Sequence, residues 1–458
     1  MSRNLFEFAL ALTVVLAAAS VSAQTSPPNI VLIMSDDMGY GDLGSYGAPD
    51  VQTPNIDTLA RDGIKLTDFY ANGVLCSPTR AGLITGRYQH RYGIESALGS
   101  GPLAEGLVVT GNSLPQLLRN AGYTTGLVGK WHLGMVDAHN PGAHGFDYFF
   151  GFRGGYIDFY QHDRGPANPD LWENDTRIER DGYMTDLITE ETVNFIERSA
   201  GDTRPFFVDV AYNAPHWPYQ PPDMPSVARN NAGHLQPHIE GTSTRADYVA
   251  MVERVDQGVG EILDALDRLG LSDNTLVIFT NDNGGEWLAR NAPLFHRKWT
   301  VWEGGIRVPA LVRWPGRIPA GRVSDQVGIT MDLTATILAV ANASVPANLE
   351  GLNLMPIWAG EEPEVERVLF WRTNVGGQVQ RAVRSGDWKL VIDGNATFVF
   401  NLRLDPGERQ DLANQRQDIA ARLRPLHDAW LQDISSEAVD RGLADPPPAR
   451  GRGAGQGQ

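Results

Sequence analysis

Short apolar runs rich in β-branched residues alternate along the chain with segments of helical periodicity. Runs typical of buried strands lie at 29–34, 124–128, 206–212, 275–280 and 308–314. Helical patterns lie at 54–61, 114–120, 184–198, 245–269 and 331–340. This alternation predicts an α/β fold, in which a large, mostly parallel sheet is sandwiched by helices.

The pattern changes near residue 367. Four short strand-like runs follow, separated by glycine-containing turns, at 368–372, 380–384, 388–392 and 398–402. A helical pattern at 418–434 comes next. We therefore expect a catalytic domain over 24–366 and a C-terminal subdomain over 367–440, built as a small antiparallel sheet with one helix. The segment 441–458 is rich in Pro, Arg, Gly and Gln, which predicts a disordered tail.

The N-terminus has the features of an export signal. Arg3 precedes an apolar run at 8–19, and Val21-Ser22-Ala23 forms a small-x-small cleavage site. The run is too short to span a bilayer, which argues against a membrane anchor. The sequence predicts a signal peptide at 1–23, a periplasmic or secreted mature protein, and no stable membrane insertion.

Charge and lysine usage narrow the class of partner. The formal net charge is −17, which makes nucleic acid an improbable ligand and requires a local cluster of positive charge to capture any anionic substrate. Lys and Arg total 38, yet the only lysines are Lys65, Lys130, Lys298 and Lys389. A position that keeps lysine in such a chain is a candidate for a compact point charge.

Polar residues follow four of the predicted strands, where a parallel sheet would bring them to one edge. Asp36, Asp37, Asp282 and Asn283 form an all-oxygen set, which suits Ca²⁺ or Mg²⁺ better than zinc. The alternative is that these residues are only helix caps and turns. Their joint occurrence after buried strands favours a metal site.

Basic residues follow the same strands. Lys130 and His132 are two apart, so an extended chain would point both to one side. His216 and Lys298 lie in two other loops of this edge. Taken singly, they could be a solvated lysine or a core histidine. Together they predict a site that binds a tetrahedral oxyanion.

Cys76 is the only cysteine, so the chain has no internal disulfide. By default an isolated cysteine is an inert buried thiol. Ser77 suits a helix N-cap and Pro78 a first helical residue, which would put Cys76 at a helix N-terminus that favours an anion. Arg80 follows in the first turn, a spacing that does not fit a phosphatase-type thiolate loop.

These motifs resemble the formylglycine-dependent sulfatase family of the alkaline-phosphatase superfamily, in particular its arylsulfatase and N-acetylgalactosamine-6-sulfatase-like members. The signature Cys-x-Pro-x-Arg, followed by Thr-Gly, lies at 76–86. Supporting motifs lie in the family's order at 29–37, 53–57, 129–134, 144–147, 279–284, 303–309 and 402–408. The match spans nearly the whole mature chain. Residues 283–297 depart most from common versions, so the resemblance leaves the substrate preference open but not the chemistry.

The resemblance implies an alkaline-phosphatase-like fold and hydrolysis of sulfate esters, on a sulfated carbohydrate or an aryl sulfate. It implies that a formylglycine-generating or equivalent enzyme oxidises Cys76 to Cα-formylglycine (3-oxoalanine), which hydrates to a geminal diol. One hydroxyl attacks sulfur and the alcohol leaves. The other hydroxyl then expels sulfate and restores the aldehyde.

The resemblance also implies a role for each site residue. One Ca²⁺, or less readily Mg²⁺, would be bound by Asp36, Asp37, Asp282, Asn283 and residue 76. Arg80 and Lys130 would hold diol and sulfate oxygens. His216 and Lys298 would bind sulfate and protonate the leaving oxygen. His132 would accept the proton as the sulfated intermediate collapses.

Three alternatives stay open at this level. A phosphate or phosphonate ester hydrolase of the same superfamily would share these residues. A sulfated-glycan-binding protein without turnover would be expected to lack the nucleophile or a metal ligand, and neither is missing. A thiol hydrolase would use Cys76 with His132 or His216.

Overall fold

The computed structural model describes residues 27–99, 105–165, 168–226, 235 and 243–440. The predicted signal peptide at 1–23 and the predicted disordered tail at 441–458 lie outside the described residues. Within the described part of the chain, no helix is both long and apolar enough to cross a membrane.

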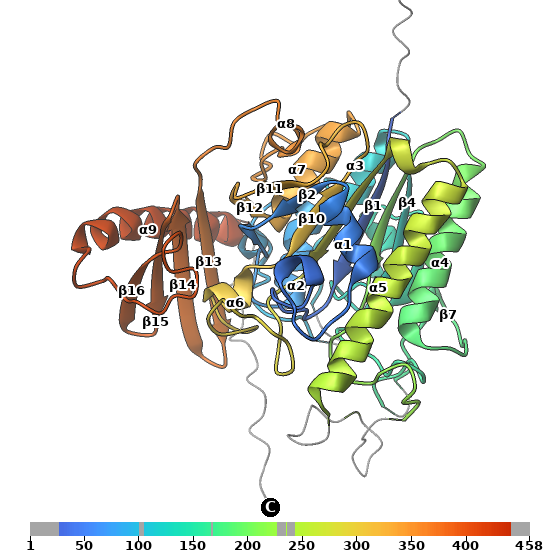
Figure 1. The fold of residues 1–458 in the computed structure, drawn as a ribbon, viewed down its shortest axis with the longest axis horizontal. Helices are drawn as coiled ribbons and strands as arrows, with labels where there is room; N and C mark the ends of the chain where they lie inside the picture. Colours follow the sequence, from blue (N-terminus) through green and yellow to red (C-terminus); the bar gives the residue numbers. More distant parts are fainter. Residues whose placement is uncertain (1–26, 100–104, 166–167, 227–234, 236–242, 441–458) are drawn as a thin grey trace, which may run out of the picture.

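A large sheet forms the centre of the molecule (Figure 1). It has ten strands, in the order β11-β2-β10-β9-β1-β8-β4-β5-β6-β7. Five neighbouring strands, β9, β1, β8, β4 and β5, are mutually parallel. In chain order the strands are β1 (Asn29–Ser35), β2 (Ile64–Leu66), β4 (Thr124–Lys130), β5 (Tyr148–Phe152), β6 (Trp172–Glu173), β7 (Thr176–Arg177), β8 (Phe206–Ala211), β9 (Thr275–Asn281), β10 (Ala310–Arg313) and β11 (Arg322–Ser324). The expected large, mostly parallel sheet is confirmed.

The run predicted at 308–314 is a strand, β10, but it does not extend the parallel set. It pairs antiparallel with β9 and with β2. The chain leaves β9 at its carboxyl end and re-enters the sheet from the same edge, without the crossover that a parallel pair needs. The whole connection, residues 282–309, therefore lies at the edge where the polar residues gather.

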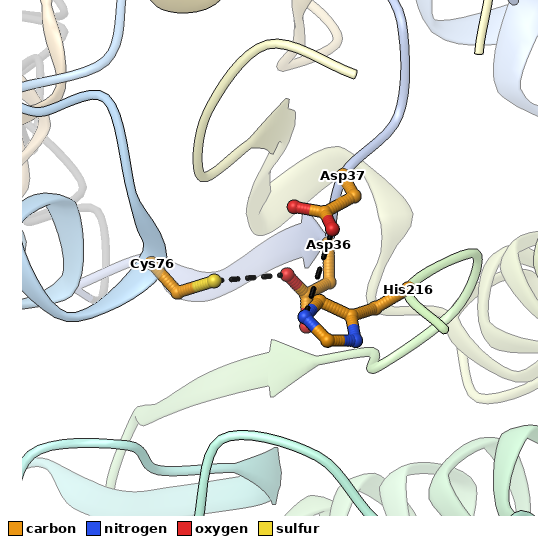
Figure 2. A group of neighbouring side chains, drawn as sticks. All are labelled: Asp36, Asp37, Cys76 and His216. Atoms are coloured by element: carbon orange, nitrogen blue, oxygen red, sulfur yellow. Dashed lines mark hydrogen bonds and ion pairs between the residues drawn. The ribbon is translucent and has the colours of Figure 1, made fainter. Parts of the chain in front are cut away.

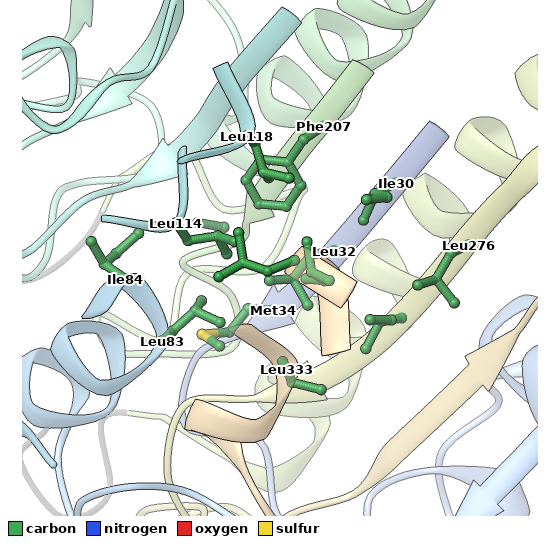
Figure 3. Close-up of a cluster of buried hydrophobic side chains, with 14 of the residues drawn as sticks. Ile30, Leu32, Met34, Leu83, Ile84, Leu114, Leu118, Phe207, Leu276 and Leu333 are labelled. Carbon is green, nitrogen blue, oxygen red and sulfur yellow. The ribbon is translucent and has the colours of Figure 1, made fainter. Parts of the chain in front are cut away.

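Helices cover both faces of the sheet, and β1 shows why. Ile30, Leu32 and Met34 point into one core, while Val31 and Ile33 point into the other, as the two-residue period of a strand requires. The first core (Figure 3) packs under α2 (Cys76–Thr85), α3 (Leu114–Asn120) and α7 (Thr330–Val340). The second packs under α1 (Pro54–Arg61), α4 (Met184–Ala200) and α5 (Arg245–Arg268). Figure 1 shows α4 and α5 side by side along that face.

The C-terminal part is the expected antiparallel sheet with one helix. Its strands are β13 (Val368–Val375), β14 (Gln378–Ser385), β15 (Trp388–Asp393) and β16 (Ala396–Asn401), paired in that order, and its helix is α9 (Gln417–Asp440). One sheet face, with Trp371 and Phe400, packs on the main body, and the other, with Leu390 and Val399, packs under α9. The predicted domain boundary at 366 stays a prediction.

Several short elements complete the described chain. β3 (Phe69–Tyr70) pairs with β12 (Gly328–Ile329), and the short helices are α6 (Glu303–Ile306) and α8 (Met355–Ala359). The 3-10 turns lie at Gly44–Tyr46, Gln89–Tyr92, Asp137–His139, Gly142–His144 and Ser272–Asn274. Elements this short do not show a hydrophobic period, so the sequence pattern did not predict them.

One acidic residue interrupts the first core. Asp209 lies on β8 opposite Leu32 of β1, on the strand face that also carries Phe207 and Ala211. It shares a small internal cavity with Arg80, and its Oδ1 atom has no hydrogen-bond partner. Burial raises the pKa of Asp209 to about 7, although the Arg80 charge opposes this shift.

Replacing Asp209 by Asn tests this assignment. The folded protein holds the Asp209 proton up to about pH 7, whereas the unfolded chain releases it near its ordinary pKa of 3.8. Stability is therefore lost as pH rises between these values, by at most roughly 4 kcal/mol at ~1.4 kcal/mol per pKa unit. We expect Asp209→Asn to raise the melting temperature relative to wild type more at about pH 8 than at about pH 5. An equal difference at both pH values would contradict the assignment.

Candidate active site

Cys76 is the first residue of α2, at the carboxyl edge of the parallel strands. Leu75 precedes the helix in an extended conformation and makes no side-chain cap. The prediction that Ser77 caps the helix is wrong, because its hydroxyl donates to the His132 carbonyl (2.9 Å) and accepts from the Leu98 amide (3.0 Å). Ser77 thus ties α2 to the loop after β4, and Cys76 itself lies within the first turn.

The Cys76 side chain is buried among charged groups (Figure 2). Its Sγ atom is 3.4 Å from Asp36 Oδ1 and 3.7 Å from Lys298 Nζ. Burial raises the pKa of the Cys76 thiol well above its ordinary value, and the Asp282 and Asp36 carboxylates raise it further. An unmodified Cys76 is therefore a neutral thiol at pH 7, which argues against a thiolate nucleophile.

Each predicted acidic ligand pairs with one predicted cation. The pairs are Lys130 with Asp36 (2.5 Å), Lys298 with Asp37 (2.7 Å) and Arg80 with Asp282 (3.0 Å), and all six side chains are buried. Buried ions are tolerated in proteins when they are paired in this way. The sequence brought these residues to one edge, and the structure brings them into contact.

Neighbouring charges and burial shift the pKa values of Asp37 and Asp282 in opposite directions. Burial alone would raise the pKa of Asp37, but Lys298, His216 and Lys130 together lower it to about 2. Burial and the Asp36 carboxylate raise the pKa of Asp282 to about 6, against the effect of Arg80. Repulsion from the neighbouring carboxylate thus destabilises the ionised form of Asp282, and a bound cation would reduce this repulsion.

A group of buried side chains in the site could hold a metal ion. Ligand atoms of Asp36, Asp37, Cys76 and His216 lie within 4.8 Å of one another. Asn283 extends the set, since its amide donates to Asp37 Oδ1 (2.8 Å) while its own buried Oδ1 has no partner. His216, which the sequence predicted to bind sulfate and protonate the leaving oxygen, lies in this closest group, whereas Asp282 and Asn283 lie beside it.

The two histidines are buried and neutral. Burial lowers the pKa of His216 to about 3, although Asp37 opposes this. Its Nε2 atom is 3.6 Å from Asp37 Oδ2, and its Nδ1 donates to the Trp217 carbonyl (2.5 Å). Burial, Lys130 and Arg80 also lower the pKa of His132 well below its ordinary value. His132 Nε2 donates to the Leu98 carbonyl (3.2 Å), which leaves Nδ1 as an acceptor without a partner.

The expected extended path from Lys130 to His132 is wrong. His132 has φ of 56°, in the left-handed region, so simple strand alternation does not relate the two side chains. Gly129 is needed just before them, because its φ is 119° and a Cβ there would lie 2.0 Å from the Ala211 carbonyl oxygen. A glycine at this point lets β4 approach β8 and aims Lys130 into the site.

Two aromatic rings lie beside the histidines, and no sequence motif predicted them as part of the site. The rings of Tyr156 and Trp217 have centroids 4.4 Å apart. Trp217 follows His216 directly, and Gly155, next to Tyr156, packs so closely on His132 that a Cβ would lie 2.5 Å from its Nε2. The aromatic pair therefore stands next to both histidines. The Trp after His216 was the one available signal.

The comparisons with known proteins agree with this geometry. Residues 28–343 match the sulfatase family, and residues 292–430 match the C-terminal region of N-sulphoglucosamine sulphohydrolase. N-acetylgalactosamine-6-sulfatase of Canis lupus familiaris is 36% identical over 478 residues, covering 91% of this chain and 88% of the relative.

The chain belongs to the sulfatase family.

Other proteins similar to this sulfatase are also named as sulfatases or are solved structures of the same fold. Arylsulfatase A of Bos taurus is 33% identical over 465 residues, covering 89% of this chain and 88% of the relative. The crystal structure of Ps i-CgsB in complex with k-i-k-neocarrahexaose has a TM-score of 0.79 at 31% identity, covering 93% of this chain and 96% of that one. The expected family, fold and enzyme class are confirmed: the chain is a sulfuric ester hydrolase.

The state of the unmodified thiol can be tested directly. In protein made without a maturation enzyme, we expect iodoacetamide to alkylate Cys76 at least about tenfold more slowly than in the urea-unfolded chain, because the thiolate is scarce. The folded rate should still be rising above pH 9.0, the ordinary thiol value. Intact mass measures the extent of labelling, and one cysteine makes the unfolded chain its own control. Equally fast labelling of the folded protein at neutral pH would refute the raised pKa.

Proposed function

We propose that this sulfatase removes sulfate from a sulfated carbohydrate, using a formylglycine made from Cys76. The observation that carries the proposal is the position of the chain's single cysteine. It lies at the start of α2, in contact with Asp36 and Lys298. The Sγ atom stands where the oxygen of the modified side chain would be. The hydrated aldehyde would supply the nucleophilic oxygen.

We further propose that Asp36, Asp37, Asp282, Asn283 and residue 76 hold one divalent cation, with Ca²⁺ preferred. A fully buried set of protein oxygens suits Ca²⁺, whereas Mg²⁺ usually keeps several waters. When bound, the cation would offset the carboxylate charge and polarise an oxygen of the sulfate group. The unpartnered Oδ1 of Asn283 supports this assignment.

Arg80 and Lys130 are suited to hold the sulfate oxygens. Arg80 directs Nε and Nη2 to Asp282 and Nη1 to the Lys130 carbonyl, which fixes its plane and leaves two of its five N–H groups. Lys130 is anchored on Asp36 by one of its three donors. Such preorganised donors can stabilise charge that develops on the transferring group.

The histidines and Lys298 are suited to move protons. His132 Nδ1 is a neutral, unpartnered nitrogen, so it can accept the proton from the hydroxyl that expels sulfate. Negative charge from a bound ester would raise the proton affinity of His216, whose Nε2 faces Asp37. His216 and Lys298 would together deliver a proton to the leaving oxygen.

The alcohol half of the substrate has a surface available at Tyr156 and Trp217. A sugar ring or an aryl ring could pack on these rings beside His216. The name of the Canis lupus familiaris relative states a sulfated sugar as its substrate, which supports a carbohydrate here. The predicted signal peptide supports export, and a formylglycine-generating or equivalent enzyme would be the maturation partner.

The proposed function predicts a preference between two matched esters. Protein whose Cys76 peptide has the mass of formylglycine should hydrolyse 4-nitrophenyl sulfate with a kcat/KM at least ~100-fold above that for 4-nitrophenyl phosphate, because the chain belongs to the sulfatase family. Cys76→Ala is the matched control and should lose both activities. A strong phosphate preference would refute the proposal, and an unmodified, active thiol would refute the formylglycine.

The role of His216 predicts a dependence on the leaving group. A proton donor matters most when the leaving alkoxide is basic, so His216→Ala should lower kcat/KM by ~100-fold or more for a sulfated sugar and far less for 4-nitrophenyl sulfate. A series of aryl sulfates of increasing phenol pKa measures the effect as a steeper slope in the variant. An equal loss for every leaving group would show that His216 acts only in binding.

A further inference from the structure

The loop between β9 and α6 carries strained residues on both sides of Lys298. His296 has φ of 68° and Trp299 has φ of 82°, in the left-handed region that bulky side chains rarely adopt. Specific bonds hold both: Asn291 donates to the His296 carbonyl (3.2 Å), and the Trp299 amide donates to the Val74 carbonyl (3.1 Å). Strain that the surroundings maintain in this way is typical of functional sites.

A series of contacts connects Lys298 with the protein surface at Trp287 and returns to Arg297, the residue before Lys298. Lys298 Nζ lies 5.6 Å from the centroid of the Trp299 ring, whose Nε1 donates to Glu286 Oε1 (3.0 Å). Glu286 is buried, and the next residue, Trp287, is 54% exposed. The Arg297 guanidinium then stacks on Trp287, with Cζ 3.7 Å from the ring, and Arg297 is the chain neighbour of Lys298. Trp287 and Arg297 thus form a stacked pair beside the sulfate-binding lysine.

The stacked pair presents an unused charge. In the described part of the chain, no carboxylate lies within 4.0 Å of the Arg297 guanidinium, and no acceptor is hydrogen-bonded to it. Stacking on Trp287 fixes the guanidinium plane and leaves its N–H groups at the edge, in the fork geometry that matches a carboxylate or a sulfate. Trp287 is also the one aromatic side chain among the exposed large hydrophobics of the described residues.

We propose that Trp287 and Arg297 form a second anion subsite, which binds a carboxylate or sulfate on the sugar next to the one that is desulfated. This inference rests on the proposed function and specifies its substrate as a polyanionic glycan. The chain carries a formal net charge of −17 and repels such a substrate as a whole, so a local cation is needed outside the sulfate pocket as well as inside it. Trp287 supplies a ring on which the second sugar can pack.

A pair of disaccharides tests the subsite in the mature enzyme. In one, a sulfated hexosamine is linked to a uronic acid; in the other, the carboxyl group is reduced to an alcohol. We expect wild type to prefer the first by about tenfold in kcat/KM, as one charge-assisted hydrogen bond pair would give, and Arg297→Ala to abolish this ratio. Arg297→Lys should retain part of the ratio because it keeps the charge and loses the fork. A third disaccharide, with a sulfate in place of the carboxylate, decides which anion is preferred.

Two further variants guard against indirect effects. Trp287→Tyr should retain most of the ratio and Trp287→Ala should lose about half of it on a logarithmic scale, because the ring orients Arg297. Arg317→Ala is the matched control: Arg317 also stacks on a tryptophan, Trp314, but at the opposite edge of the sheet, and its loss should leave the ratio unchanged. A wild-type ratio near one, or a ratio that Arg297→Ala leaves intact, would overturn the subsite.

Failure of the subsite and failure of the proposed function give different results. If the chain is not a glycan sulfatase, the wild type will release sulfate from neither disaccharide. Calorimetric titration of the inactive Cys76→Ala protein with the same two disaccharides then decides the subsite without turnover. Tighter binding of the carboxylate form that vanishes with Arg297→Ala would support it, and equal binding of both forms would refute it.

Discussion

The requirement that buried charges be paired governs the arrangement of this active site. Three carboxylates and three cations lie out of contact with water at one edge of the sheet, each acid joined to one cation. Leaving any of them alone would cost several kcal/mol, roughly 3 to 5 by experience with broken buried pairs. Because the six residues come from the loop after β1, from α2, from β4 and from the segment after β9, all three pairs form together only when these four segments have reached their final positions. The chemistry and the folding of the core therefore depend on the same contacts.

The same pairing explains which parts of the site the sequence could reveal. Apolar runs predicted four of the five parallel strands, β1, β4, β8 and β9, since strands buried on both faces are nearly continuous hydrophobic segments, and they missed the fifth, β5. Once the strands were placed, the residues that follow them had to share an edge, and the family motif identified the cysteine among them. Short or edge strands such as β6 and β7 have too few residues to show a period, and they were missed.

Side-chain pairing across the site could not be predicted from the pattern. Nothing in the spacing shows that Lys130 selects Asp36 while Lys298 selects Asp37, because both acids follow the same strand. The left-handed backbone at His132 also breaks the alternation that the extended prediction assumed. Serine is a favoured N-cap residue, yet the Ser77 hydroxyl donates a hydrogen bond to the loop after β4, because a tertiary partner overrides the local preference. Asp209 has apolar neighbours in the sequence, Val208 and Val210, and only the structure shows that it lies beside a small cavity in the apolar core.

The C-terminal sheet has a place in the same argument. Lys389 of β15 lies 2.8 Å from Glu303 and 2.9 Å from Glu408, so a third buried lysine joins that sheet to the start of α6. The Val301 amide donates to Gln380 of β14 (3.1 Å), and Trp302 packs on the rings of Phe398 and Phe400. Glu303, Val301 and Trp302, which contact the small sheet, all lie within five residues of Lys298 along the chain. The small sheet thus anchors the far end of the loop that carries Lys298, Arg297 and Trp299, which gives it a role in holding the active site although it contributes none of the charged groups around Cys76. Both lysines are in buried ion pairs, but their surroundings differ. Lys389 lies between two acids, whereas Lys298 also contacts Cys76.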